Sequence, residues 1–340
     1  MIWQGSPLPL INGTNGTDET EGTKIFFSYV ILIPFVPVVP SFSFVPSAYS
    51  SEANNMDIEL DSIVLRNGKI TVAILPVMGG KIIQMSRTGE PHNYIWFDEK
   101  QAKRYDPAAE YDPQFSGGIE ELLPSDIPET INGIFYPDHG ELWRTPLSIE
   151  QFDDTRLLLS ATLSTTGFSY QREMMLDGNS LVCNTTIRNI GEHSKHFLWK
   201  LHCALNISPG DTIHIPAKCM TAADVEWSTL TDTMPRAFGG TIIASENNGS
   251  SEFLYLTDLS GNYCEAHFAD GHRLRCNFDG SVFTNIWYFG TYGKLNSSYT
   301  GILEPCTNYP MSVKDAANRG CCASLDASES LSSTVKWTLI

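Results

Sequence analysis

From about residue 58 onward, polar and apolar positions follow one another in short, strand-like runs. Residues 63–74 show an apolar run, an Asn-Gly pair and a second apolar run, a pattern that predicts a β-hairpin. Turn signals such as Asp177-Gly178 and Asp279-Gly280 separate the later runs. We expect further strands over residues 81–85, 156–163, 169–176, 181–190, 197–207, 241–244, 252–256, 263–268, 273–278, 284–289, 299–303 and 332–339.

The spacing of these runs indicates the fold class. Short strands at intervals of about 8–12 residues are typical of a β-sandwich. No amphipathic helix longer than about a dozen residues stands out. We find no linker after residue 55 and no clear internal repeat. The sequence therefore predicts one large all-β, antiparallel sandwich domain over residues 56–340.

Residues 1–55 have a different character. Residues 12–23 are polar and acidic, which predicts disorder. The apolar run over residues 25–39 contains Pro34 and Pro37 and is too short for a good transmembrane helix. Small residues over 46–50 resemble the cleavage region of a secretory signal. Two interpretations stay open: an unstructured extension of a cytoplasmic protein, or a late-starting signal of a secreted one.

Composition and charge narrow the choice of partners. Apolar residues make up 42% of the 340 residues, so a large core is available. The net charge is -17, from 39 acidic residues against 22 Lys and Arg. Such a surface repels nucleic-acid phosphates and anionic lipids, so we expect neither partner for the main domain.

Motifs for common cofactors are absent from the sequence. There is no P-loop and no GxGxxG that opens a helix, so nucleotide binding has no support. HExxH and GxSxG are also missing. The eight cysteines form no CxxC pair, and we expect them to be free core thiols. We therefore expect no cofactor and no metal site.

Three segments place a titratable residue among apolar residues, glycine or proline. The first reads GGIEELLP at 117–124 and continues as YPDHGELWR at 136–144 with His139. The second, residues 197–207, is an apolar strand with His202 on the face of Lys200. The third, 301–310, contains Glu304 before Pro305, which we expect to end the strand. Each histidine also has a purely structural interpretation, but a carboxylate on a half-buried strand is costly unless it is paired.

In this order the segments resemble the aldose 1-epimerase (galactose mutarotase-like) superfamily. Residues 75–82 (LPVMGGKI), 287–293 (WYFGTYG) and the closing strand also match, so the resemblance covers about residues 58–340. It implies a large antiparallel β-supersandwich. It also implies an isomerase that interconverts the α and β anomers of a sugar by acid–base catalysis.

The resemblance assigns roles to three residues. His202 matches the histidine that protonates the ring oxygen as general acid. Glu304 matches the general base that takes the proton of the anomeric hydroxyl. His139 matches the histidine that binds the sugar near the ring oxygen. Histidine suits the acid role because its ordinary pKa of about 6.5 lies near working pH.

Other assignments from the resemblance are less direct. Arg144 resembles an arginine of the hexose-phosphate epimerases, although the residues before it differ. Trp143, Trp287 and Tyr288 are candidate surfaces for stacking on a sugar, with core packing as the other interpretation. The sugar-binding aspartate of the family has no clear match, and Asp224 and Asp258 are only candidates.

The sequence leaves alternatives to the epimerase. A carbohydrate-binding protein without activity would have the same sandwich, but both His202 and Glu304 are present. A hexose-phosphate 1-epimerase or a lyase of acidic polysaccharide would need a basic cluster, which this acidic chain does not offer. The expected partner is a small-molecule sugar or the end of an oligosaccharide.

Overall fold

The computed structural model describes residues 59–340. The predicted N-terminal extension over residues 1–55, including its signal-like segment, lies outside the described residues. Within residues 59–340, no helix has the length and hydrophobicity needed to cross a membrane.

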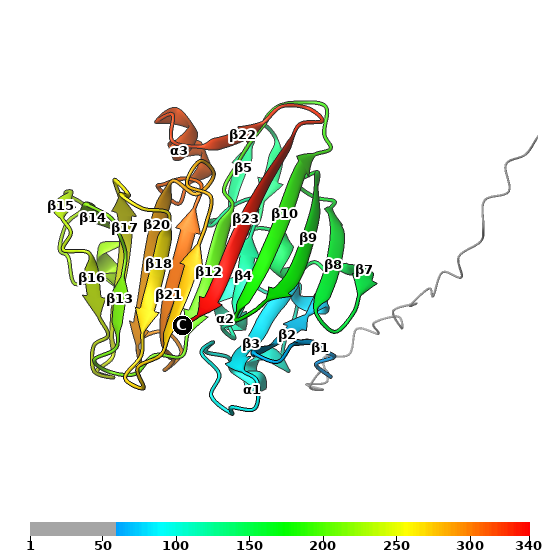
Figure 1. The fold of residues 1–340 in the computed structure, drawn as a ribbon. Coiled ribbons are helices and arrows are strands. Elements are labelled where there is room, and N and C mark those ends of the chain that lie inside the picture. The colour runs from blue at the N-terminus through cyan, green and yellow to red at the C-terminus, as the bar shows by residue number, and fades with distance from the viewer. Residues whose placement is uncertain (1–58) are drawn as a thin grey trace, which may run out of the picture. The chain divides into compact units, whose positions relative to one another are not determined.

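Two large antiparallel sheets make up most of the described chain (Figure 1). The ten-stranded sheet has the order β1 (Ile63–Arg66), β2 (Ile70–Leu75), β3 (Lys81–Arg87), β4 (Ile119–Leu122), β12 (Lys200–Leu205), β21 (Tyr299–Cys306), β20 (Asn285–Tyr292), β17 (Ser250–Thr257), β14 (Cys219–Ala222) and β15 (Arg236–Ala237). The nine-stranded sheet has the order β16 (Thr241–Ile243), β13 (Thr212–His214), β18 (Tyr263–His267), β19 (Arg273–Asn277), β23 (Ser330–Leu339), β10 (Ser180–Asn189), β9 (Phe168–Asp177), β8 (Arg156–Leu163) and β7 (Ser148–Phe152).

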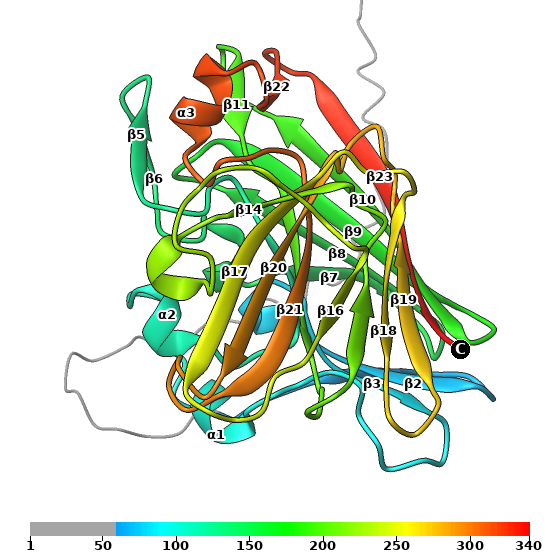
Figure 2. The ribbon, with the colours of Figure 1, turned by 90° about the vertical axis from the view of Figure 1, so that its left-hand side faces the viewer.

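The remaining elements are short and lie around the sandwich. Two small two-stranded sheets, β5–β6 and β11–β22, and helix α3 gather at one end of it in both views (Figures 1 and 2). Their bounds are β5 (Glu129–Ile131), β6 (Ile134–Tyr136), β11 (Lys195–Phe197), β22 (Ala323–Leu325) and α3 (Val313–Asn318). The other helical turns are α1 (Glu99–Ala102), α2 (Tyr111–Gln114), η1 (Pro76–Met78), η2 (Leu142–Arg144) and η3 (Val225–Trp227).

The main hydrophobic core lies between the two sheets. Figure 2 shows β17, β20 and β21 in one layer and β18, β19 and β23 in the other. Buried residues of both layers, such as Leu303 and Trp337, belong to one apolar cluster. On β10 and β23 buried and more exposed positions alternate, because successive side chains of a strand point to opposite faces. The predicted antiparallel β-sandwich is confirmed.

Two strand predictions need correction. The predicted strand over residues 197–207 is broken into β11 and β12, with Leu198 and Trp199 between them. The predicted end before Pro305 is wrong, because β21 continues to Cys306 and Pro305 pairs with Ile286 of β20. On its other edge, β21 pairs with β12 at Leu303 and again at Cys306. The missing N–H of Pro305 thus interrupts the ladder on one side only.

Strand β4 is buried along its whole length although it contains two adjacent glutamates. Glu121 points into the core, where its carboxylate lies 3.1 Å from Arg172 Nε of the opposite sheet. The hydroxyl of Tyr170 and the indole N–H of Trp199 each donate to Glu121 at 3.0 Å, and Thr185 donates at 3.2 Å. These contacts satisfy the charge of Glu121 and join the two sheets.

We predict that Glu121→Ala destabilises the domain strongly. Removal of the carboxylate leaves the guanidinium of Arg172 buried without its counter-charge, which costs about 3–5 kcal/mol. Urea denaturation monitored by tryptophan fluorescence measures the loss. The matched control is Glu150→Ala on an exposed position of β7, expected within about 0.5 kcal/mol of wild type. Equal stability of both variants would contradict the prediction.

Candidate active site

A row of side chains crosses the outer face of the ten-stranded sheet. Glu120 of β4 is paired with His202 of β12, and Glu304 of β21 is paired with Trp287 of β20. The pairs Lys200–Cys306 and Cys203–Leu303 place His202 opposite Glu304. Because the neighbouring side chains Cys203 and Leu303 belong to the core, the row points to the face turned away from it.

A cavity of about 220 Å³ lies over this row. One part of its wall is polar and charged, and the rest is apolar. The lining residues are Tyr111, Asp112, Phe115, Asp126, Ile127, Asp138, His139, Lys200, His202, Asp224, Trp227, Phe253, Phe289, Leu295, Ile302, Glu304 and Met311. Several of them come from α2, η3 and the segment after β4, so loops on the outer face complete a site whose floor is the sheet.

Lys200 connects two carboxylates at the floor of the cavity. Its ammonium contacts Asp126 and lies 2.6 Å from Glu304 Oε2, with the Trp287 ring centroid 4.6 Å away. Lys200 is 2% exposed. Burial opposes its charge, but Asp126 and Glu304 outweigh burial and raise its pKa, so it is an ammonium. Burial raises the pKa of Glu304 above its ordinary value, while Lys200 acts in the opposite direction.

His139 sits in a tight turn and is bonded to a carboxylate. Its Nδ1 lies 2.9 Å from Asp138 Oδ1, and the Tyr111 ring stacks on it with centroids 3.9 Å apart. The backbone of His139 is left-handed, with φ of 52°, and its N–H donates to the carbonyl of Asp126 at 2.8 Å. Burial disfavours the imidazolium, but the Asp138 bond and nearby Asp126 outweigh it and raise the pKa of His139.

His202 has opposite surroundings. Its Nδ1 is 3.4 Å from the Tyr111 hydroxyl and 3.7 Å from Glu120 Oε1. That carboxylate is shared, since it accepts the Tyr111 hydroxyl and lies 3.3 Å from Lys81. Burial, followed by the charge of Lys200, lowers the pKa of His202 well below its ordinary value, so its ring is neutral. Among the described side chains, none hydrogen-bonds its other ring nitrogen, Nε2.

The structure brings together three of the predicted site residues. His139, His202 and Glu304 all line the cavity. Asp224, which caps η3, also lines it, whereas Asp258 contacts Cys219 elsewhere.

None of the other predicted sugar contacts lines the cavity. Trp143 is 2% exposed and packs edge-on against Tyr111. Trp287 is buried beneath Lys200, and Tyr288 is in the main core. Arg144 ends η2 and is not among the lining residues. Trp143 and Trp287 thus pack against lining residues of the cavity, and none of the four residues lines it.

Several site residues were not predicted from the sequence. They are Tyr111, Glu120, Asp126, Asp138 and Lys200. For Lys200 a signal exists, because a lysine inside an apolar strand must find a counter-charge when buried. Asp126 comes from an irregular segment and Tyr111 from the single helical turn α2, and the sequence pattern predicts the fold of neither.

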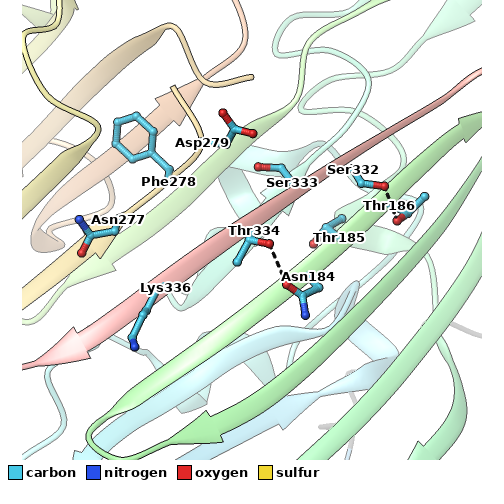
Figure 3. Close-up of a pocket in the computed structure, with 10 residues that line it drawn as sticks. All are labelled: Asn184, Thr185, Thr186, Asn277, Phe278, Asp279, Ser332, Ser333, Thr334 and Lys336. Carbon is cyan, nitrogen blue, oxygen red and sulfur yellow. Dashed lines mark hydrogen bonds between the residues drawn. The ribbon is translucent and has the colours of Figure 1, made fainter. Parts of the chain in front are cut away.

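A second depression, outside this cavity, contains fewer ionisable side chains. A depression of about 520 Å³ on β10, β19 and β23 is lined mainly by serine, threonine and asparagine (Figure 3). Four of these polar side chains are engaged in two hydrogen bonds of 2.8 Å, one between Thr334 and Asn184 and one between Thr186 and Ser332. Its only ionisable lining residues are Asp279 and Lys336. Residues 59–340 contain no group of three or more His, Cys, Asp or Glu that fits a metal ion.

We predict that Lys200→Met destabilises the protein in a pH-dependent way. Asp126 and Glu304 would then be buried side by side without a cation, at a cost of about 3–5 kcal/mol at pH 7. Without Lys200 the pKa of Glu304 rises further above its unfolded value, so the folded variant takes up protons as the pH falls. The loss of unfolding free energy should therefore shrink from pH 7 to pH 5. A loss that is independent of pH would contradict this explanation.

Comparisons with known proteins identify the fold. No family model and no curated protein sequence matches the chain. The Slr1438 protein of Synechocystis sp. PCC 6803 superposes with a TM-score of 0.68 at 19% identity, over 85% of this chain and 99% of that one. A galactose mutarotase-like protein from Lactobacillus casei gives 0.63 at 14% identity, over 82% and 100%. A galactose mutarotase related enzyme from Lactobacillus acidophilus gives 0.63 at 12%, over 82% and 97%. The described chain therefore has the galactose mutarotase-like β-sandwich fold.

Proposed function

We propose that this protein is an isomerase that interconverts the α and β anomers of a sugar. Glu304 acts as the base on the anomeric hydroxyl, and His202 lies at the ring oxygen. One observation carries the proposal: the two side chains face each other across β12 and β21 at the floor of one cavity. The names of the structural relatives support the same class of reaction.

The reaction requires a proton acceptor at the anomeric hydroxyl and a proton donor at the ring oxygen, the two oxygen atoms that are bonded to the anomeric carbon C1. Removal of the proton from the anomeric hydroxyl and protonation of the ring oxygen open the hemiacetal to the aldehyde. Rotation about the C1–C2 bond and reclosure then give the other anomer. Lys200 beside Glu304 favours the carboxylate form that a base requires.

The cavity offers both kinds of contact that a sugar needs. Phe253, Phe289 and Ile302 are neighbours on three adjacent strands and form an apolar stripe beside the row of His202 and Glu304. Such a surface packs against the C–H groups of a pyranose ring. On the other side, charged groups can hydrogen-bond to hydroxyls. We propose a free sugar or the end of an oligosaccharide as substrate.

We predict that Glu304→Gln abolishes most of the activity. Glutamine cannot accept the proton, and one general base typically contributes about 10²–10⁴-fold. The measurement is the anomeric equilibration of freshly dissolved α-glucose and α-galactose in dilute buffer, by polarimetry or NMR. Glu150→Gln on the exposed strand β7 is the matched control with wild-type rate expected. Sugar binding without acceleration by the wild type would instead favour a non-catalytic carbohydrate-binding protein.

We predict that sugar phosphates are poor substrates. Five carboxylates line the cavity, and Lys200, its one Lys or Arg, already contacts two of them. Repulsion of a phosphate dianion by even about 1.4 kcal/mol lowers kcat/KM tenfold. Glucose and glucose 6-phosphate compared at one pH test this expectation. A preference for the phosphate would favour a hexose-phosphate 1-epimerase.

A further inference from the structure

A further cleft lies directly beside the cavity of the candidate active site. Its volume is about 620 Å³, larger than the 220 Å³ of the cavity itself. The walls come from α1 and the segment before it, from the end of α2, and from the turn that leads into β21. None of the residues placed in the acid–base site lines this cleft, so the proposed reaction leaves it without a role.

The cleft and the cavity share part of their walls. Phe115 lines both of them. Asp112 and Leu295 line the cavity, while the residues that follow them, Pro113 and Asn296, line the cleft. The Asn296 side-chain amide donates to the carbonyl of Asp112 at 3.3 Å and holds the two segments together at this boundary. The two spaces are therefore immediate neighbours.

The cleft lies along the strands from the acid–base pair. On β21, Glu304 and Ile302 line the cavity, and Tyr299 at the start of the same strand lines the cleft. A strand rises about 3.4 Å per residue, so Tyr299 and Glu304 lie about 17 Å apart. The Trp96 N–H donates at 2.9 Å to the carbonyl of Ala204, which is paired with Ile302. Because this distance exceeds the length of one pyranose ring, a single sugar bound at Glu304 does not reach the cleft.

Trp96 forms a fixed aromatic surface on the wall of the cleft. Its ring stacks on that of Phe115, with centroids 5.5 Å apart and an angle of 20° between the planes. A Cβ on Gly117 would lie 2.4 Å from the ring atom Cε3 of Trp96, so the ring rests directly on the backbone of this glycine. Trp96 is nevertheless only half-buried. An aromatic ring that is already immobilised can pack against the C–H groups of a sugar at little entropic cost.

The remaining lining of the cleft is polar and almost uncharged. It includes the amide of Gln101 and the hydroxyl of Ser297. Asp98 is the only Asp, Glu, Lys, Arg or His among the described lining residues. Its Oδ1 accepts the backbone N–H groups of Lys100 and Gln101 at 3.0 and 3.1 Å, which leaves Oδ2 for a hydroxyl of a ligand. An aromatic face beside neutral polar groups fits a carbohydrate better than an anion or an apolar ligand.

We propose that this cleft is a subsite for the further residues of an oligosaccharide whose reducing end reacts in the cavity. This inference rests on the proposed function and narrows its substrate from a free sugar to an oligosaccharide. Only the residue at the reducing end has a free anomeric hydroxyl, so the other residues must lie outside the cavity. The cleft adjoins the cavity on the side of Ile302 and offers them stacking on Trp96 and hydrogen bonds to their hydroxyls.

The first measurement compares trisaccharides with their monosaccharides. NMR exchange spectroscopy follows the interconversion of the two anomers at equilibrium for glucose, maltotriose and cellotriose, and for galactose and galactotriose. We expect at least one trisaccharide to have a KM about tenfold below that of its monosaccharide, the change that about 1.4 kcal/mol of additional binding produces. Equal KM values for every trisaccharide and its monosaccharide overturn the proposal.

Variants of the cleft locate the effect. Trp96→Ala should raise the KM of the favoured trisaccharide about tenfold and leave kcat and the KM of the monosaccharide unchanged, because it removes binding that is equal in ground and transition states. Asp98→Ser should act in the same direction. Serine still caps α1 but lacks the second carboxylate oxygen. Phe152→Ala is the matched control, since it removes an exposed aromatic ring from β7 of the other sheet.

Two outcomes with these variants oppose the proposal. A Trp96→Ala variant that weakens the monosaccharide and the trisaccharide equally shows that Trp96 only supports the cavity through Phe115. If Trp96→Ala does not fold, Asp98→Ser decides, because its side chain makes no ring contact with Phe115. An unchanged KM of the trisaccharide in Asp98→Ser then overturns the proposal.

Direct binding separates failure of this inference from failure of the proposed function. Calorimetric titration of the wild type with the favoured trisaccharide requires no turnover, and Trp96→Ala should lower the affinity about tenfold. Binding that depends on Trp96, without acceleration for any sugar, overturns the proposed function and leaves the cleft a carbohydrate site. Acceleration with glucose or galactose, without tighter binding of any trisaccharide, overturns the inference and leaves the proposed function.

Discussion

The pairing of charges that are buried on β4 and β12 determines how this molecule is organised. These strands run through the middle of the ten-stranded sheet and are buried on both faces, yet they carry Glu120, Glu121 and Lys200. A buried ion without a partner would cost about 3–5 kcal/mol, a large fraction of the roughly 5–15 kcal/mol by which a domain is stable. Each therefore needs a counter-charge from another segment. Glu121 finds Arg172 across the core, and Lys200 finds Asp126 and Glu304.

The strand register determines which of these buried charges lie on the face of the site. Glu120 lies on the outer face beside His202 because Glu121 faces the core, and a shift of one residue would exchange them. The core network around Glu121 thus fixes the orientation of the neighbouring residue in the site. Pro305 adds a local effect, since the ladder between β12 and β21 opens where His202 and Glu304 face each other. Rigid strands, rather than loops, hold both of these groups.

The architecture could be predicted from the sequence because the alternation of polar and apolar residues can be recognised within each single strand. The hairpin over residues 63–74 and strand β8 were predicted with correct type and nearly correct bounds. Strand β4 was missed because two consecutive glutamates look like a solvated segment. Their burial depends on Arg172 and Lys81, which lie far away along the chain. The local pattern of polar and apolar residues carries no information about such long-range ion pairs.

The same reason explains what was and was not found in the site. His139, His202 and Glu304 were recognised through short motifs, and all three line the cavity. Trp287 was expected to contact the sugar. It lies beside Glu304 on the neighbouring strand, but the ammonium group of Lys200 covers its ring. Whether a tryptophan on a strand is reached by a ligand depends on the side chains above it. Those come from other elements and are set only in the folded chain.

Burial creates a difficulty for acid–base catalysis that the paired charges resolve. The proposed reaction needs an ionised carboxylate and a proton donor at the same pH. Burial alone raises the pKa of Glu304 and lowers that of His139, which closes the interval in which both forms coexist. Lys200 acts on Glu304 in the opposite direction, and Asp138 does the same for His139. The two counter-charges therefore oppose the effect of burial on both groups, so that a carboxylate and an imidazolium can coexist in one buried cavity over a wider range of pH.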